Sequence, residues 1–540
     1  MVNLELEKGS LEKITNESKS LKRTSSIPKV NKPVFLGAAI FCALFYAPTL
    51  IFREQMQPIG SAIVNVITHR LDWAFLLLAF ACFIFAIWLA FGRYAHVKLG
   101  GADDEPEFKR FTWVAMIFTG GVGAGLVHWS MAEPISYLMA PPFLAEPLSA
   151  EAAGWSLAYG IFHWGILAWG LFVPASITFA YMIYVKKIPY FSPAYACRGV
   201  LGDIVNGWAG KAINIFVIIG IVGAMGASIG VAVPMISEVA ANLIGIENSL
   251  LFKGATLVIL GLIFTYTVWS GMQKGIKKFS EINTWLCFAL LAFILATGPT
   301  LWILSFYIEN LGMVIQNFLQ MAFSTDPIRR EGFPQRWTVF YWAWWLAFSM
   351  YFGLFIARIS RGRTIREVVL NMTLATTLGC SIFFMIFGGY AVNLQLNEGV
   401  DLVGILAASG TAPMIATVLN TLPFAVLVIP YWLVVVFFFK AIAIDANTYT
   451  VAMISCKKIK YKQEPPKWTR LFWCLMVCSV GFGIISVGGL QIVRLSVVAT
   501  SLPLLFITII LMMTLVKWLK EDFGDITQPN ALVVDYEEDE

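Results

Sequence analysis

The sequence has few charged residues, which make up 13% of its 540 positions. Soluble proteins carry about 25% charged residues, so most of this chain does not face water. Hydrophobic residues reach 58% of the chain. They occur in blocks of about 18 or more, the length of helix that crosses the hydrocarbon layer of a bilayer. The composition therefore predicts an all-α protein that crosses the membrane many times.

Several chemical motifs are also missing. No GxxxxGK[ST] sequence is present, which argues against an ATP-driven pump. None of the eight cysteines falls in a predicted outside connection, so we expect no disulfide. Cys474 and Cys478 have no histidine nearby, and we predict neither a metal site nor a cofactor. His128 and Glu133, five residues apart on one helix, make a poor catalytic pair, so an enzyme is only a remote alternative.

Hydropathy divides the chain into a polar N-terminal segment (1–32), a membrane domain (33–518) and an acidic tail (519–540). The connection after the seventh span contains IENLGMVIQNFLQMAF, whose apolar spacing predicts an amphipathic helix at the outer surface. We predict twelve transmembrane helices, at 33–52, 73–92, 111–139, 154–185, 212–243, 254–270, 281–307, 337–357, 368–392, 423–455, 469–489 and 493–516.

The distribution of basic residues sets the orientation. With residues at span edges counted in the adjacent connection and a cytoplasmic N-terminus, inside segments hold 30 of the 38 Lys and Arg, and outside connections hold 7. Lys440 is the remaining one and lies within a span. This asymmetry places both termini in the cytoplasm of a cell-membrane protein. The net charge of +5 thus reflects topology and does not indicate nucleic acid binding.

The segment WTVFYWAWWLAF contains an aromatic stripe. At 100° per residue, its members fall on one helix face over about 16 Å, which is longer than an aromatic belt at one membrane depth. The stripe is either a packing face or the wall of a ligand site. Its members are Trp337, Tyr341, Trp344, Trp345 and Phe348.

A second aromatic group lies in span 4, within FHWGILAWGLF. Trp164 and Trp169 lie about 140° apart on an ideal helix, with Phe172 between them. Three aromatic side chains spread over this angle can line two or three walls of a cavity. Ring faces without a nearby carboxylate suit an alkylated ammonium group, which makes no hydrogen bonds and is attracted to each face.

Span 3 is rich in glycine, with Gly120, Gly121, Gly123 and Gly125 within six residues. Glycine weakens a helix by about 1 kcal/mol per residue relative to alanine. The run indicates either close helix packing or an unwound stretch beside a cavity. The third glycine favours unwinding.

These motifs resemble those of the betaine/carnitine/choline transporter (BCCT) family. FYWAWW followed by ARISRGRTIRE matches the family signature closely, and FHW, Glu133-Pro134 and GMQKG agree in order and spacing. The sequence TDPIRREGFPQRWTVFYWAWW is most similar to the carnitine/γ-butyrobetaine antiporter branch. The resemblance implies a LeuT-type core of two inverted five-helix repeats after two extra helices. It also implies a homotrimer in the lipid bilayer and small quaternary ammonium substrates.

Carried over by position, the resemblance implies an aromatic substrate site. Phe172 and Phe348 stand where relatives carry Tyr or Trp, and Ser136 stands where the antiporter branch has a Tyr. Trp337 and Tyr341 would form a site nearer the outer end, where substrate enters. The substrate-binding residues implied are Trp164, Trp169, Phe172, Trp344, Trp345, Phe348, Gly121, Gly123 and Gly125.

The resemblance also bears on the coupling ion. Sodium-coupled members carry a Thr-Ser pair before the span 10 aspartate, whereas this chain has Ile442 and Ala443 before Asp445. A hard cation needs oxygen ligands, and these two side chains offer none. Lys277 aligns with an arginine that replaces sodium in the antiporter branch, although it is equally a cytoplasmic loop lysine. Lys440, inside span 10, is a further candidate fixed charge.

Together these features favour sodium-independent exchange, such as L-carnitine for γ-butyrobetaine. The Gly-x-Gly-x-Gly of span 3 is similar to the glycine betaine carriers and leaves a sodium- or proton-coupled betaine or choline symporter open. A cation channel is a more remote alternative. Osmotically regulated relatives end in a long basic segment, whereas this sequence ends in an acidic run, so we expect activity that is insensitive to osmolality.

Overall fold

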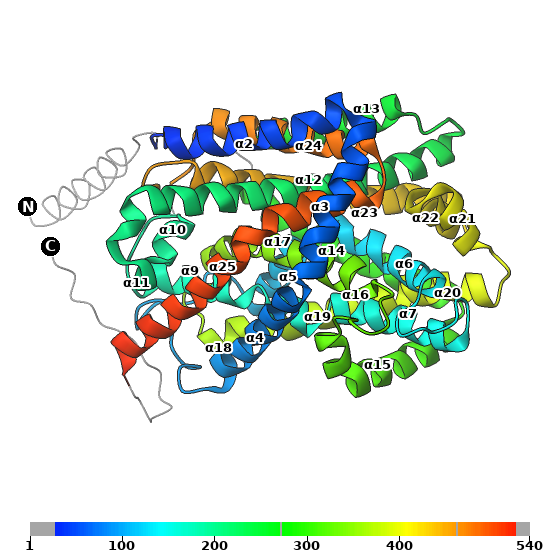
Figure 1. The fold of residues 1–540 in the computed structure, drawn as a ribbon, viewed down its shortest axis with the longest axis horizontal. Helices are drawn as coiled ribbons and strands as arrows, with labels where there is room; N and C mark the ends of the chain where they lie inside the picture. The colour runs from blue at the N-terminus through cyan, green and yellow to red at the C-terminus, as the bar shows by residue number, and fades with distance from the viewer. Residues whose placement is uncertain (1–27, 122, 271–272, 461–462, 525–540) are drawn as a thin grey trace, which may run out of the picture.

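The structure is a computed structural model that describes residues 28–121, 123–270, 273–460 and 463–524 (Figure 1). Most of these residues are helical, and the only β-structure within these ranges is a set of isolated β-bridges. The predicted all-α class is confirmed.

The first half of the chain forms long helices interrupted by short ones. In order, they are α2 (Lys32–Ile51), α3 (Arg53–Arg70), α4 (Asp72–Phe91), α5 (Arg110–Gly121), α6 (Gly123–Met139), α7 (Ala150–His163), α8 (Ile166–Gly170), α9 (Val173–Tyr184), α10 (Pro193–Ala196), α11 (Arg198–Leu201), η1 (Gly202–Asn206), α12 (Trp208–Ile244) and α13 (Leu250–Ser270).

The second half of the chain also consists of long helices interrupted by short ones. It contains α14 (Gln273–Thr297), α15 (Thr300–Phe323), α16 (Phe333–Arg336), α17 (Thr338–Ile359), α18 (Ile365–Leu370), the π-helical η2 (Asn371–Ala375), α19 (Thr376–Phe383), the π-helical η3 (Phe384–Gly388), α20 (Gly389–Leu396), α21 (Leu402–Ser409), α22 (Thr411–Asn420), α23 (Ala425–Ile454), α24 (Lys467–Val487) and α25 (Leu490–Phe523).

Many of these helices have the length and apolarity of membrane spans. Eight qualify among the described residues, or up to ten if each of two bent helix pairs counts as one span. Two shorter apolar helices, Lys32–Pro48 and Leu250–Ile263, lie at the first and sixth predicted spans. The multi-pass membrane fold is therefore established, and the count of twelve stays a prediction.

The seventh span is the clearest difference from the sequence prediction. The continuous helix predicted over 281–307 is wrong, because α14 ends at Thr297 and α15 begins at Thr300 after a bend of 108°. Thr300 follows Gly298 and Pro299, a pair that disrupts helices. The predicted amphipathic segment is helical, but its helix starts eight residues earlier, at Thr300 instead of 308.

The two aromatic segments lie in the interior of the bundle. The most apolar 18-residue windows of Ala150–Tyr184 and Phe333–Ile359 are 94% and 89% buried, the highest values among the candidate spans. Helix α17 packs against α9, α25, α12 and α23, while α2, α24 and α12 run side by side along one edge (Figure 1). An aromatic belt at the membrane surface is excluded for α17, because its rings are covered by protein.

Candidate functional site

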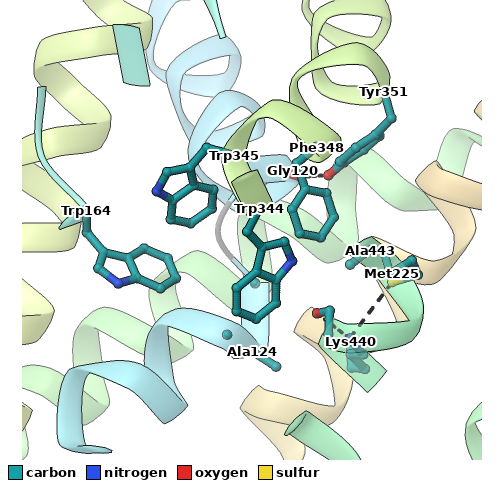
Figure 2. A pocket seen from close by; sticks show the side chains of 13 residues that line it. Gly120, Ala124, Trp164, Met225, Trp344, Trp345, Phe348, Tyr351, Lys440 and Ala443 are labelled. Atoms are coloured by element: carbon teal, nitrogen blue, oxygen red, sulfur yellow. Dashed lines mark hydrogen bonds between the residues drawn. The ribbon is translucent and has the colours of Figure 1, made fainter. Parts of the chain in front are cut away.

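A small cavity lies where α5, α6, α12, α17 and α23 meet (Figure 2). Trp164, the residue after α7, forms part of its wall, and one face of α17 forms another. The lining residues are Gly120, Gly123, Ala124, Gly125, Trp164, Met225, Ser228, Trp344, Trp345, Phe348, Tyr351, Lys440 and Ala443.

The break in span 3 opens directly onto this cavity. Helices α5 and α6 are bent by 63° relative to each other. Gly123 begins α6 with φ at +49°, a left-handed conformation that residues with a Cβ rarely adopt. The hydroxyl of Tyr351 donates to the freed carbonyl of Gly120. The predicted helix interruption is thus confirmed, although Val122, between the two helices, lies outside the described residues.

The three tryptophans of the cavity present ring faces and no free N–H group. Trp164 Nε1 donates to Glu133 Oε1 at 2.7 Å, and Trp345 Nε1 donates to the His163 carbonyl at 2.9 Å. Trp344 Nε1 donates to the Ala224 carbonyl at 3.3 Å. Because each indole N–H bonds to the protein, these side chains offer a ligand π surface and dispersion contacts only.

Two residues predicted to line the site lie behind it instead. Trp169 donates its indole N–H to the Trp164 carbonyl at 3.1 Å and stacks on Trp345 with centroids 6.5 Å apart. Phe172 stacks on Trp169 at 5.2 Å and also contacts Trp345. Gly121 is the last residue of α5, and its contacts lie outside those that the structure describes. Trp169 and Phe172 therefore form a second layer that fixes the position of the lining rings.

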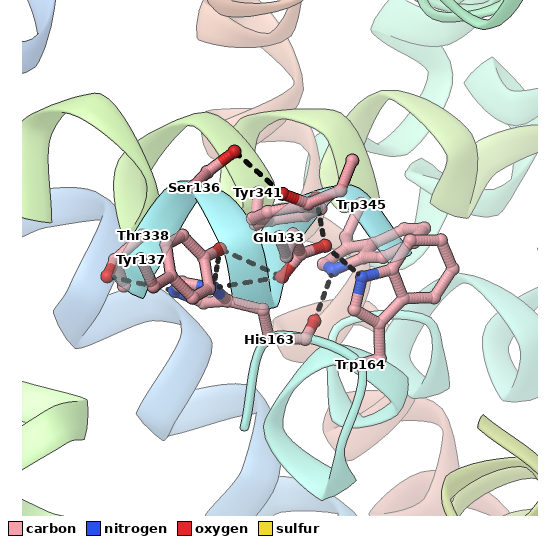
Figure 3. A network of polar contacts seen from close by, with 9 residues as sticks. Glu133, Ser136, Tyr137, His163, Trp164, Thr338, Tyr341 and Trp345 are labelled. Carbon is pink, nitrogen blue, oxygen red and sulfur yellow. Dashed lines mark hydrogen bonds and ion pairs between the residues drawn. The ribbon is translucent and has the colours of Figure 1, made fainter. Parts of the chain in front are cut away.

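Glu133 is the centre of a buried polar network beside the cavity (Figure 3). Its carboxylate accepts hydrogen bonds from Trp164, from the hydroxyl of Tyr341, and from the hydroxyl of Tyr137 at 2.8 Å. His163 lies 3.0 Å from the Tyr137 hydroxyl. The network joins spans 3, 4 and 8, and it fixes the orientation of one cavity wall. Glu133 belongs to a motif that matches the family, but the sequence does not predict this role.

A larger cavity of about 600 Å³ lies toward the predicted outside connections and contains Trp337. Arg494 lies over the Trp337 ring at 5.1 Å. Trp129 packs edge-on against both Trp337 and Trp344, at 6.0 and 6.2 Å, and so separates the two cavities. Of the two residues predicted for an outer site, Trp337 therefore lines this cavity, whereas Tyr341 bonds to Glu133 and lines neither cavity.

The three candidate coupling residues have different surroundings. Lys440 lines the aromatic cavity, and its Nζ donates to Ser228 Oγ at 2.7 Å. Asp445, on the same helix, forms an ion pair with Arg470 at 2.9 Å and does not line the cavity. Lys277 lies in α14 at a position whose side chain is outside the described residues.

Sequence reasoning missed Tyr351, Met225 and Ser228 as cavity residues. Tyr351 lies on the same face as the aromatic stripe, fourteen residues after Trp337 and one turn beyond Phe348. Extending the helical projection by one turn would have found it. Met225 and Ser228 carry no such signal, because their approach depends on the packing of α12 against α17 and α23.

The cavity is small in this structure, at about 30 Å³. A cavity of this volume holds one or two water molecules, whereas sites for small organic ligands usually measure about 300 Å³ or more. Binding of an organic molecule here therefore requires the lining rings to move apart.

Comparison with known proteins gives two findings. A family model described as "BCCT, betaine/carnitine/choline family transporter" matches residues 33–524. Among solved structures, a Na⁺-coupled sialic acid symporter in a substrate-bound outward-open state is similar, with 12% sequence identity. The match covers 77% of this chain and 81% of that chain, with a TM-score of 0.39, which does not establish a common fold.

Proposed function

Because this chain belongs to the betaine/carnitine/choline transporter family, we propose that it is a sodium-independent exchanger of quaternary ammonium zwitterions. The trimethylammonium head binds against Trp164, Trp344, Trp345 and Phe348. One betaine enters as another leaves, as in exchange of L-carnitine for γ-butyrobetaine. The protein works as a homotrimer in the cell membrane with both termini in the cytoplasm.

The main observation in support of this proposal is that the cavity tryptophans have no free hydrogen-bond donors. All three indole N–H groups donate to the protein. A trimethylammonium group has no N–H to donate and no lone pair to accept, so it loses little when water leaves it. A ring face then attracts its positive charge by up to about 2 kcal/mol when desolvated.

The lack of a side-chain oxygen at positions 442 and 443 of α23 supports independence from sodium. Ala443 lines the cavity, and neither its side chain nor that of Ile442 offers an oxygen. Lys440 provides a fixed positive charge in the same cavity, and Lys277 is a second candidate for this role. The Gly-x-Gly-x-Gly motif at the helix break resembles the sequence of the symporter branch and favours sodium- or proton-coupled symport as the second candidate.

Uptake into proteoliposomes tests the exchange mechanism. Vesicles preloaded with γ-butyrobetaine should accumulate labelled L-carnitine equally well in sodium and in potassium buffer, and empty vesicles should take up little. A proton-gradient uncoupler should leave exchange unchanged. If empty vesicles accumulate substrate only under an inward sodium gradient, the protein is a symporter. A persistent leak current without saturation would instead indicate a channel.

A further inference from the structure

Lys440 is a buried lysine in the wall of the aromatic cavity. Its residue is 1% exposed, and its Nζ donates to Ser228 Oγ at 2.7 Å, with Met225 Sδ at 3.9 Å. An ammonium has three N–H donors, so at least one remains for a ligand. None of the lining residues is an aspartate or glutamate, and the described residues show no ion pair to Lys440.

Asp445 and Glu133, on two of the helices that line the cavity, already have other partners. Asp445, five residues along the same helix, pairs with Arg470. Glu133 accepts hydrogen bonds from Trp164, Tyr341 and Tyr137. A charged side chain within a membrane protein is costly unless it finds a partner or a cavity. The titratable group that does interact with Lys440 is the Cys478 thiol, which is uncharged while protonated, so a molecule inside the cavity can supply the negative charge.

We propose that the Lys440 ammonium binds the carboxylate of a zwitterionic substrate and thereby makes the cavity select zwitterions over simple cations. This inference rests on the proposed function, because it assumes that the ammonium head lies against the aromatic rings.

The cavity has two chemically different sides. Rings of Trp164 and Trp345 lie on one side, and Lys440 lies on the other with Trp344 between them in the view of Figure 2. Gly123, at the helix break, faces α23 beside Lys440, since a Cβ at Gly123 would lie 3.8 Å from the Phe439 carbonyl oxygen. A molecule with a cationic head and an anionic tail matches these two sides.

The charge of Lys440 also acts against other ligands. A molecule that carries only a positive charge would place two like charges in one water-poor cavity, where their repulsion is poorly screened. A zwitterion adds no net charge and supplies the carboxylate that the ammonium lacks. The preference for zwitterions over cations then comes both from the attraction of Lys440 to a carboxylate and from its repulsion of a second positive charge.

Binding measurements on the purified full-length protein test this assignment. We compare γ-butyrobetaine with its methyl ester, which keeps the trimethylammonium head but has no carboxylate. The wild-type protein should bind the acid at least tenfold more tightly than the ester. Lys440→Met should weaken binding of the acid at least tenfold without weakening binding of the ester, and Lys440→Arg should keep the preference. Lys517→Met, which changes an exposed lysine of α25 that lines neither cavity, is the matched control and should leave the preference unchanged.

The outcomes separate this inference from the proposed function. If wild type binds acid and ester equally, Lys440 does not select by charge, and this conclusion needs no variant to fold. The inference is also overturned if folded Lys440→Met keeps the wild-type preference or weakens both ligands equally. If wild type binds neither ligand, the proposed function fails and the inference fails with it.

Discussion

Trp164 and Trp345 are the residues on which binding should depend most directly. Both present ring faces to the cavity and donate their N–H groups elsewhere. Trp164→Ala or Trp345→Ala should lower affinity for a quaternary ammonium substrate by up to about thirtyfold, since a ring face contributes up to about 2 kcal/mol. Equilibrium binding to purified protein measures the change.

The exposed Trp468, on α24, supplies the control for these two variants. Trp468→Ala should bind substrate normally. Wild-type affinity in both cavity variants, at equal expression and thermal stability, would show that the rings do not hold the substrate.

Glu133 should matter for stability as well as transport. Glu133→Leu leaves the Trp164, Tyr137 and Tyr341 donors without their acceptor, and each unsatisfied buried group costs about 1–3 kcal/mol. Tyr137→Phe removes a single donor and should cost about 1 kcal/mol. The apparent thermal midpoint in detergent should therefore fall much more for Glu133→Leu. Equal midpoints for the two variants would contradict a central role for Glu133.

Sequence reasoning identified the residue types at the cavity better than their positions. The helical projection of α17 placed Trp344, Trp345 and Phe348 on one face, because that projection depends only on local geometry. The projection of span 4 assumes one ideal helix and does not reproduce the positions of Trp169 and Phe172, since that span breaks before Ile166 and again after Gly170. The hydrogen bond from Lys440 to Ser228 depends on how two helices that are far apart in the sequence pack together, so the local sequence does not predict it.

At the scale of the helix, the break between α5 and α6 depends on one glycine. Gly123 has φ at +49°, and an alanine there is disfavoured by about 1–2 kcal/mol. Gly123→Ala should therefore reduce the transport rate severalfold, because the strained segment forms part of the cavity wall. Initial rates of exchange in proteoliposomes provide the measurement.

Gly261, on α13, is the matched control for that substitution. A Cβ there meets no atom within 4 Å, and its backbone has no positive φ. Gly261→Ala should be neutral or slightly stabilising, because alanine favours helix. A transport defect of equal size in both variants would mean that the break has no special role.

The helix boundaries predicted from hydropathy agree with the structure where a helix is straight, and they differ from it where the chain bends. The apolar run through 281–307 is continuous in composition, so it predicts a single span. The Gly298-Pro299 pair marks the bend between α14 and α15, and reading that pair as a helix end would have corrected the boundary.

For the whole molecule, the distribution of basic residues predicts which ends face the cytoplasm. Seven of the eight cysteines are buried and Cys478 is half-buried, so the native background of thiol labelling should be low. Ile328→Cys, at a position that is 90% exposed in a predicted outside connection, should react with an impermeant maleimide in intact cells. Asp103→Cys, exposed in a predicted inside connection, should react only after lysis. The reverse pattern would invert the topology.

The tryptophan wall has a further consequence under the proposed function, because an indole N–H only donates and offers no lone pair to a cation. A sodium ion or a primary amine would have to shed its hydration shell at the aromatic wall and would find no oxygen or nitrogen on the three tryptophans to replace it. Trimethylammonium has a diffuse charge and a loosely held shell, so dehydration costs it far less. Under the proposed function, the wall would thus act as a dehydration filter that favours trimethylammonium over sodium.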